Sequence, residues 1–323
     1  MLQIHCHPDD APLMNMAHHP AHKTRNHLHR FAPARLNFVF AFGVGLNVAI
    51  VVMQAGYGLV AHSTALLADA GHNLGDVLSL LVAWGAASLA KLPPTERFTY
   101  GLRSTSIMAA VFNALFLLVV MGGIAWEAIR RFSEPVAVQG NIVMAVAGIA
   151  IVLNGISAWL FAPGRHGDIN IRGAFLHMLS DALVSLGVVV AGGLIVLTGW
   201  SWIDPVATLV VVGVIVFGTW DLLKDSFQMA LAAVPEGIDP GRVRLYLSGL
   251  PGVSRVHDLH IWALSTTQTA LTCHLVMPDG HPGDHFTSRI AENLHTQFNI
   301  EHSTLQIEIS EEADCRLASD EVI

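Results

Sequence analysis

Three long stretches of the sequence contain no charged residue at all. They are Leu36–Ala61, Ser104–Trp126 and Val136–Ala162, with 26, 23 and 27 residues. A helix needs about 20 mostly apolar residues to cross the hydrocarbon core of a bilayer. Each stretch therefore predicts a transmembrane helix, and the chain is expected to be a membrane protein.

Three further apolar stretches bring the predicted number of spans to six. Ala65–Ala90 and Gly173–Trp202 are long enough but contain ionisable residues, whereas Pro205–Trp220 is short and can continue into the interface. We expect residues 1–35 to form a polar, His-rich cytosolic tail and residues 36–233 to form a six-helix membrane domain.

The basic residues near the ends of these spans favour cytoplasmic termini. If the N-terminus lies inside, ten Lys and Arg residues fall on the inner side and only Arg130 and Arg131 on the outer side. Cytoplasmic loops carry an excess of Lys and Arg, so both termini are expected in the cytoplasm. The compact loops favour a bacterial inner membrane.

The composition excludes several other classes of protein. Hydrophobic residues make up 53% of the chain and charged residues only 13%, against about 25% charged in soluble domains. Three cysteines, Cys6, Cys273 and Cys315, are too few for a disulfide scaffold. The net charge of −8, without a run of Lys and Arg, argues against a nucleic-acid partner.

The sequence after residue 233 has the character of a small α+β domain. Residues 234–311 predict the order α-β-β-α-β, which suits an open sheet with helices on one face, followed by a tail at 312–323. A domain this small is marginal alone, so dimerisation would help it. The expected elements are a helix at Ile238–Leu250, strands at Ser254–Leu264 and Gln268–Met277, a helix at Pro282–Phe298 and a strand at Ser303–Ser310.

One short pattern occurs twice inside the interrupted spans. His72-Asn-Leu-Gly-Asp76 and His177-Met-Leu-Ser-Asp181 both read His-x-Leu-x-Asp. Residues four apart share one face of a helix, so two such faces turned towards each other present two imidazoles and two carboxylates. This is a suitable ligand set for tetrahedral Zn²⁺, and the sequence predicts an intramembrane metal site.

Other interpretations of these residues remain open. Each His–Asp pair could be a plain hydrogen bond between helices, but ionisable groups inside a membrane are costly and usually functional. Asp69 could line an exit path or bond a backbone group. Metal binding needs neutral His and ionised Asp and so competes with protons. We therefore expect a metal/proton antiporter rather than an enzyme.

Three rival functions make different predictions. An intramembrane metalloenzyme would need an open zinc position with a general base nearby, and the sequence contains no His-Glu-x-x-His. A membrane-anchored metal sensor or scaffold would keep its function after Asp76 or Asp181 is changed to Ala. A passive channel could not drive the metal uphill with a pH gradient.

At these residues the chain resembles the cation diffusion facilitator family, and more closely its zinc-transporter branch. The resemblance implies a homodimer with six spans per protomer and a cytosolic ferredoxin-like domain. It also implies export of a divalent metal in exchange for protons by alternating access, without an organic cofactor. The matching stretches are Leu67-Ala-Asp-Ala-Gly-His72-Asn-Leu-Gly-Asp76, Tyr100-Gly-Leu-Arg103, His177-Met-Leu-Ser-Asp181, Asp204-Pro205 and Val256-His-Asp-Leu-His-Ile-Trp262.

The resemblance also implies metal ligands outside the membrane. In the cytosolic domain His257, His274 and Glu308 match one zinc site, and His302 with Cys315 matches a second. The alternative is that His257 and His274 are ordinary strand histidines. Further positions implied are a metal-binding His5-Cys6-His7 element in the tail, which could equally hold incidental ligands, and a charge pair of Arg103 with Asp225 at the dimer centre.

Overall fold

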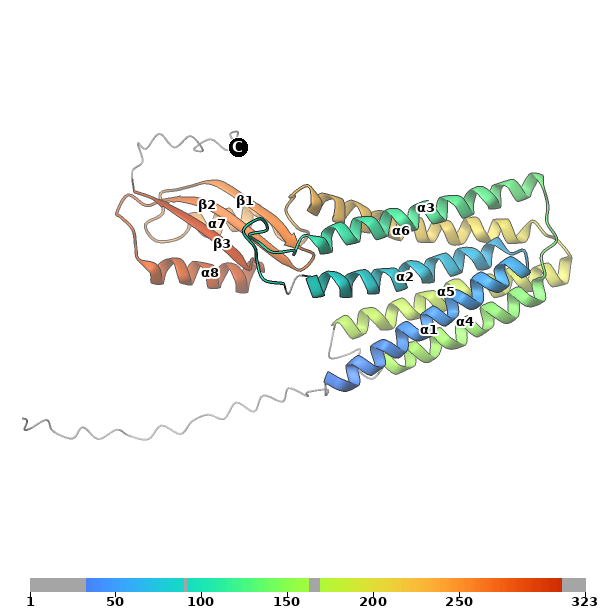
Figure 1. Ribbon diagram of the computed structural model, residues 1–323. Coiled ribbons are helices and arrows are strands. Elements are labelled where there is room, and N and C mark those ends of the chain that lie inside the picture. Colours follow the sequence, from blue (N-terminus) through green and yellow to red (C-terminus); the bar gives the residue numbers. More distant parts are fainter. Residues whose placement is uncertain (1–32, 90–91, 163–168, 310–323) are drawn as a thin grey trace, which may run out of the picture.

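The computed structural model describes residues 33–89, 92–162 and 169–309, and these form a helical bundle with a small sheet domain at one end (Figure 1). Four helices of the bundle are long and apolar enough to cross a membrane, within α3, α4, α5 and α6. The bundle helices are α1 (Pro33–Val60), α2 (Thr64–Leu89), α3 (Thr105–Ser133), α4 (Gly140–Phe161), α5 (Ile169–Thr198) and α6 (Ile203–Ala230).

The first two helices of the bundle differ from the other four. The described apolar part of α1 is Val44–Val60, and α2 carries Asp69, His72 and Asp76 within an otherwise apolar sequence. All six helices form where the sequence predicts an apolar helix, with boundaries that shift by up to ten residues.

The ends of α5 and α6 can be compared with the sequence prediction. The fifth stretch was predicted to run to Trp202, but α5 ends at Thr198 because Gly199 takes a φ of +72°, which terminates a helix. The sixth stretch, Pro205–Trp220, was expected to be able to continue past Asp221, and α6 does continue to Ala230 through the exposed Asp221 and Lys224.

Small residues bring α2 close to α3. A Cβ atom on Gly71 would lie 2.7 Å from Met121, and one on Gly75 would lie 3.0 Å from Leu117. Met121 and Leu117 are buried in the core of the bundle. The two glycines are one helical turn apart, so α3 packs on this side of α2, whereas the neighbouring His72 and Asp76 contact α5.

The C-terminal domain confirms the predicted order of elements. Its three strands lie in the order β1-β2-β3, with β1 antiparallel to β2 and β2 parallel to β3. One face packs against the helices around a core that includes Val256, Leu271 and Ile290. The elements are α7 (Pro240–Ser248), β1 (Arg255–Ser265), β2 (Gln268–Val276), α8 (Asp284–Phe298) and β3 (His302–Glu308).

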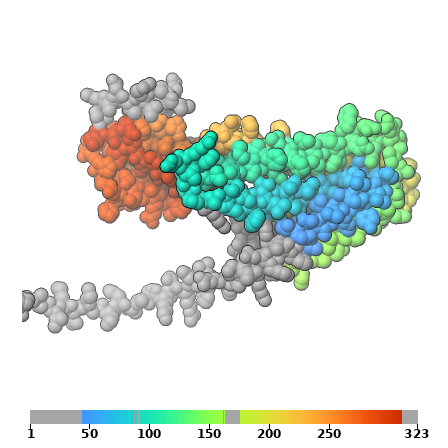
Figure 2. All heavy atoms as spheres, viewed as in Figure 1, coloured from blue at the N-terminus to red at the C-terminus, as the bar shows by residue number. Residues whose placement is uncertain are grey.

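The hairpin between β1 and β2 contacts the start of α3. Ser104 Oγ donates to the Leu264 carbonyl oxygen at 3.3 Å, and the Thr266 backbone N–H donates to Ser106 Oγ at 3.1 Å. In the space-filling view, the segment that precedes α3 lies directly against the sheet domain (Figure 2). The two parts of the chain are therefore joined by specific contacts as well as by the connection after α6.

Candidate metal centre

The repeated His–Asp pattern comes together between α2 and α5. His72 Nε2 lies 3.2 Å from Asp181 Oδ1, and His177 Nε2 lies 3.3 Å from Asp76 Oδ2. Within each helix the His–Asp distances are longer, at 3.9 Å for α2 and 3.8 Å for α5. Each imidazole therefore lies closer to the carboxylate of the other helix than to that of its own. We call these four residues the quartet.

The spacing of the quartet fits a small tetrahedral cation. Zinc bonds of about 2.0–2.2 Å to nitrogen and oxygen require ligand atoms roughly 3.3 Å apart. His72, Asp76 and Asp181 offer ligand atoms that all lie within 4.8 Å of one another. His177 falls outside that group because the two imidazole centroids are 6.1 Å apart, although its Nε2 reaches both carboxylates.

Several polar atoms of the quartet are buried without a hydrogen bond of acceptable geometry to any described residue. They are His72 Nδ1, Asp76 Oδ2 and Asp181 Oδ2. Buried polar atoms without partners are rare in folded proteins and point to a role beyond stability. Two carboxylate oxygens in this state favour a cation between α2 and α5.

Burial within the quartet is uneven. The Asp181 side chain is only 1% exposed, whereas His177 is 41% exposed. His72 and Asp76 lie between these limits, at 19% and 18%. An ion could therefore approach from the side of His177 and be held against Asp181.

A second buried network lies one turn from the quartet, around Asp69. Asp69 Oδ2 accepts hydrogen bonds from Gln54 Nε2 at 2.5 Å and Ser185 Oγ at 2.8 Å. Asn73 Nδ2 donates to Gln54 Oε1 at 3.1 Å. The donors to the Asp69 carboxylate are side chains rather than a backbone group, and they connect α1, α2 and α5. This network was not predicted from the sequence. The signal that could have indicated it is the presence of the polar Gln54 and Ser185 within apolar stretches.

Asp204 forms a third buried network, at the end of the bundle away from the sheet. Its Oδ2 accepts from the Thr64 backbone N–H at 2.8 Å and from Thr64 Oγ1 at 2.7 Å. Arg131 Nη1 lies 3.6 Å from the same oxygen. A carboxylate from the first turn of α6 thus caps α2, the helix that carries half of the quartet, and compensates its N-terminal dipole.

The cytosolic candidates His257, His274 and Glu308 also meet. His257 and His274 are paired across β1 and β2, and Glu308 follows on β3. His257 Nε2 lies 2.9 Å from Glu308 Oε2, and His274 Nδ1 lies 2.9 Å from Glu308 Oε1. The three residues offer ligand atoms within 4.8 Å of one another, which suits a small cation.

The remaining predicted residues are not part of this cluster. His302 begins β3, six residues before Glu308, and its ring contacts Tyr100 with centroids 5.4 Å apart. The Arg103–Asp225 pair was placed at a dimer centre, which a single chain does not contain. His5, Cys6, His7 and Cys315 lie outside the described residues.

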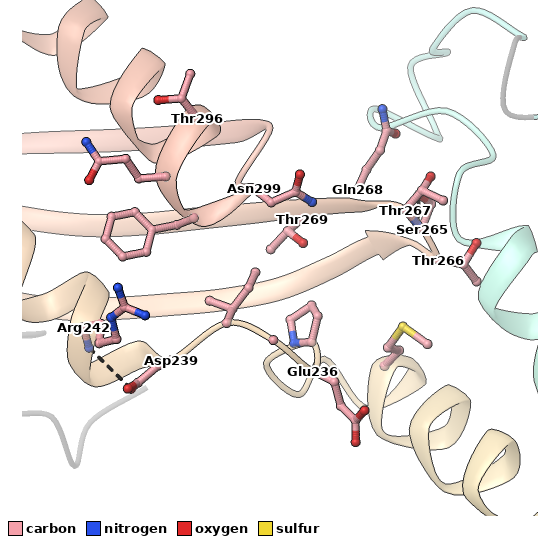
Figure 3. A pocket seen from close by; sticks show the side chains of 16 residues that line it. Glu236, Asp239, Arg242, Ser265, Thr266, Thr267, Gln268, Thr269, Thr296 and Asn299 are labelled. Carbon is pink, nitrogen blue, oxygen red and sulfur yellow. Dashed lines mark hydrogen bonds between the residues drawn. The ribbon is translucent and has the colours of Figure 1, made fainter. Parts of the chain in front are cut away.

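A separate pocket of about 390 Å³ lies between the end of α6 and the sheet domain (Figure 3). Its lining includes Glu236, Asp239 and Arg242 but no histidine or cysteine. Asp239 caps α7 through the backbone N–H groups of Gly241 and Arg242. The pocket therefore lacks the ligands of either candidate centre.

These features define a membrane protein with ionisable ligands between its helices and a second ligand cluster outside them. Residues 40–230 match the family described as the cation efflux transmembrane domain, and residues 235–310 match the cation efflux protein cytoplasmic domain. The chain belongs to the cation efflux, or cation diffusion facilitator, family. Members of this family are transporters, so the metalloenzyme alternative is wrong.

Several relatives are similar over most of their length. The zinc transporter ZitB of Escherichia coli (strain K12) is 36% identical over 91% of this chain and 93% of its own. The cadmium, cobalt and zinc/H(+)-K(+) antiporter of Bacillus subtilis (strain 168) is 35% identical over 80% and 84%. Among solved structures, the metal-bound C-terminal domain of the CzcD transporter from Cupriavidus metallidurans is 35% identical, with a TM-score of 0.21, covering 22% of this chain and 99% of that chain.

Proposed function

We propose that this chain exports divalent metal ions, with Zn²⁺ as its main substrate, from the cytosol across a bacterial inner membrane. The observation that carries the proposal is the quartet, in which two imidazoles and two carboxylates from α2 and α5 meet at 3.2–3.9 Å. The names of the relatives, which transport zinc, cadmium and cobalt, support the same substrate class.

The quartet supplies a reason for proton coupling. Metal binds to neutral imidazole and ionised carboxylate, so an arriving ion releases protons and a departing ion takes them up. Buried charges without a counter-ion are costly, and a site that has lost its metal is therefore stabilised by protons. Alternating access of this site to the two sides then exchanges metal for protons.

The proposed topology places six helices across the membrane and both termini in the cytoplasm. The starts of α1, α3 and α5 lie at the end of the bundle that carries the sheet domain (Figure 1). Among the described basic residues, Arg35 and Arg172 lie in the first turns of α1 and α5, and Arg103 lies just before α3. The positive-inside rule favours a cytoplasmic location for this end. Residues 36–233 then form the membrane domain and 234–311 a cytosolic, ferredoxin-like domain.

We further propose that His257, His274 and Glu308 hold a metal ion in the cytosolic domain of a homodimer. They offer two nitrogen ligands and one carboxylate, and bound Zn²⁺ would cross-link the three strands. The match to a cytoplasmic dimerisation domain supports the homodimer. The second cytosolic site at His302 and Cys315, the His5-Cys6-His7 element and the Arg103–Asp225 pair remain predictions.

Metal uptake into proteoliposomes tests this function. Wild type and His177→Ala are compared with Zn²⁺, Cd²⁺, Co²⁺ and Mn²⁺, with and without a pH gradient. The proposal predicts saturable Zn²⁺ uptake that a pH gradient drives uphill and that His177→Ala removes. Equal rates for the two proteins would contradict the proposal, and uptake indifferent to the gradient would favour a passive channel.

A further inference from the structure

One residue of β1 breaks the regular pairing of the cytosolic sheet. His257 pairs with His274, and His260 pairs with Thr272. Between these two pairs β1 advances by three residues, whereas β2 advances by two. The extra residue lies between them, and Asp258 has a left-handed backbone with a φ of 50°. This is a β-bulge, a feature that often re-aims a side chain next to a functional site. Asp is one of the few residues that tolerate this conformation.

The bulge decides which face of the sheet the neighbouring side chains occupy. In a regular strand alternate residues share a face, so Asp258 would follow Val256 into the hydrophobic core. Instead, Leu259 and Ile261 pack against that core with Val256. Asp258 is left on the face of the candidate ligands, with its side chain 12% exposed.

The Asp258 carboxylate lies between two histidines. Its Oδ2 is 3.4 Å from His274 Nε2, and its Oδ1 is 2.8 Å from His260 Nε2. The other ring nitrogen of His274, Nδ1, faces Glu308 at 2.9 Å. The imidazole of His274 thus presents one nitrogen to the candidate metal cluster and the other to Asp258.

A metal-bound histidine is expected to have this arrangement, with one ring nitrogen toward the metal and the other toward a carboxylate. A histidine that ligates metal through one ring nitrogen usually donates its other N–H to a carboxylate, which fixes the ring orientation and raises its basicity as a ligand. We propose that Asp258 is a positioning residue that orients His274 for metal binding in the cytosolic domain. The inference rests on the proposed metal site of His257, His274 and Glu308.

The location of Asp258 also costs stability, which argues against a purely structural role. A left-handed non-glycine residue stores backbone strain, and a partly buried carboxylate loses hydration. An apolar residue in a regular strand would avoid both costs. The bulge places an acceptor 3.4 Å from the ring nitrogen of His274 that does not face Glu308.

The test measures zinc affinity of the full-length protein in nanodiscs, by competition with a chromophoric chelator. His177→Ala serves as the background, so that the transport site contributes little. The cytosolic site is defined as the zinc binding that Glu308→Ala abolishes. Asp258→Asn keeps the shape and the tolerance for positive φ but removes the charge. Asp239→Asn, which changes an exposed capping Asp in the same domain, is the matched control.

We expect Asp258→Asn to weaken zinc binding at this site by about 10- to 100-fold, the range typical of such partners, and Asp239→Asn to leave it unchanged. Because Asp258 acts through His274, its substitution should have no further effect in a His274→Ala background but should keep its effect in a His257→Ala background. Asp258→Gly accepts a positive φ without strain and should show the same loss, even if Asp258→Asn folds poorly.

The possible failures can be told apart. If the protein shows no zinc binding that depends on Glu308, the proposed cytosolic site is wrong. If that binding exists but Asp258→Asn and Asp258→Gly bind zinc as tightly as the background protein, the role of Asp258 is wrong. An equal loss of affinity in the His274→Ala background would also overturn it, because Asp258 would then act on the fold and not on His274.

Discussion

His72 on α2 and Asp181 on α5 approach to 3.2 Å, although they are separated by 109 residues in the sequence. This contact, with its counterpart between His177 and Asp76, joins two helices of the bundle through groups that a metal ion would also use. Protonation or metal binding therefore acts directly on the packing of α2 against α5. Exchange of a metal ion for protons at the quartet can thus change how α2 and α5 pack in the bundle.

The ligand types in the quartet should determine which metal is preferred. Replacing the most exposed ligand in His177→Asp gives one imidazole and three carboxylates, a harder set that suits Mn²⁺ better. We expect the ratio of Mn²⁺ to Zn²⁺ transport to rise by about tenfold, which corresponds to roughly 1.4 kcal/mol. Initial uptake rates in proteoliposomes measure this ratio. His285→Asp, a change on the sheet domain, should leave it unaltered.

The Asp69 network should contribute to the stability of the bundle. Ser185→Ala removes a hydrogen bond of 2.8 Å to a fully buried carboxylate, which should cost about 1–3 kcal/mol. Thermal unfolding in detergent measures the change. Ser180→Ala is a matched control on the same helix, because Ser180 is exposed and its hydroxyl donates to the backbone carbonyl of Leu176. If Ser185→Ala and Ser180→Ala lowered the thermal stability equally, the Asp69 network would make no contribution to the stability of the bundle.

Asp204 should hold the first turn of α2 in place. Asp204→Ala removes the carboxylate that accepts from the buried Thr64 backbone N–H and the Ser63 hydroxyl, which should cost about 1–3 kcal/mol. Arg131 keeps its contact with Glu127. Asp204→Asn still caps a helix and should cost less. Hydrogen exchange at the amides of residues 64–66 reports the loss of the cap. Glu134→Ala, which removes an exposed pair with Arg130, should leave this exchange unchanged.

Cys273 should be unreactive in the folded protein. Burial, with a contribution from the Asp258 carboxylate, raises the pKa of its thiol from 9.0 to about 12. Only the thiolate is a good nucleophile, so alkylation at pH 8 should be far slower in the folded chain than in guanidinium. Cys6→Ser and Cys315→Ser leave Cys273 as the only thiol for this measurement.

The same pKa shift predicts how stability depends on pH. The unfolded thiol ionises near pH 9 and the folded one near pH 12, so the contribution of Cys273 is fully present below pH 9. It is lost progressively as the pH rises from 9 towards 12. Cys273→Ala should flatten this part of the stability curve in urea unfolding, and an unchanged slope would contradict the shift.

The sequence was sufficient for most of the helical architecture and for placing a His and an Asp on one face of each of two helices. Uncharged runs of more than 20 residues leave little choice of structure, and the i,i+4 spacing places His72 with Asp76 and His177 with Asp181. The spacing could not show that the closest contacts run between helices, because the relative rotation of α2 and α5 depends on packing. Gly71 and Gly75, against Met121 and Leu117, contribute to that rotation.

The networks around the site were harder to foresee. Gln54 and Ser185 lie 15 and 116 residues from Asp69 in the sequence, and nothing in their spacing links them. The bulge at Asp258 was also not predictable from the sequence, because regular strand alternation would place the Asp258 side chain in the hydrophobic core. In both cases the missing information is a contact between distant segments, which local patterns do not contain.

The most direct test of the quartet as a transport site is a simultaneous record of zinc and proton flux in proteoliposomes, for wild type and Asp181→Asn. Wild-type vesicles loaded with a pH-sensitive dye should become alkaline inside as external Zn²⁺ enters and protons leave. Asp181→Asn should remove both fluxes together while the protein remains folded. Zinc entering Asp181→Asn vesicles at the wild-type rate, or entering wild-type vesicles without proton release, would contradict the proposed exchange.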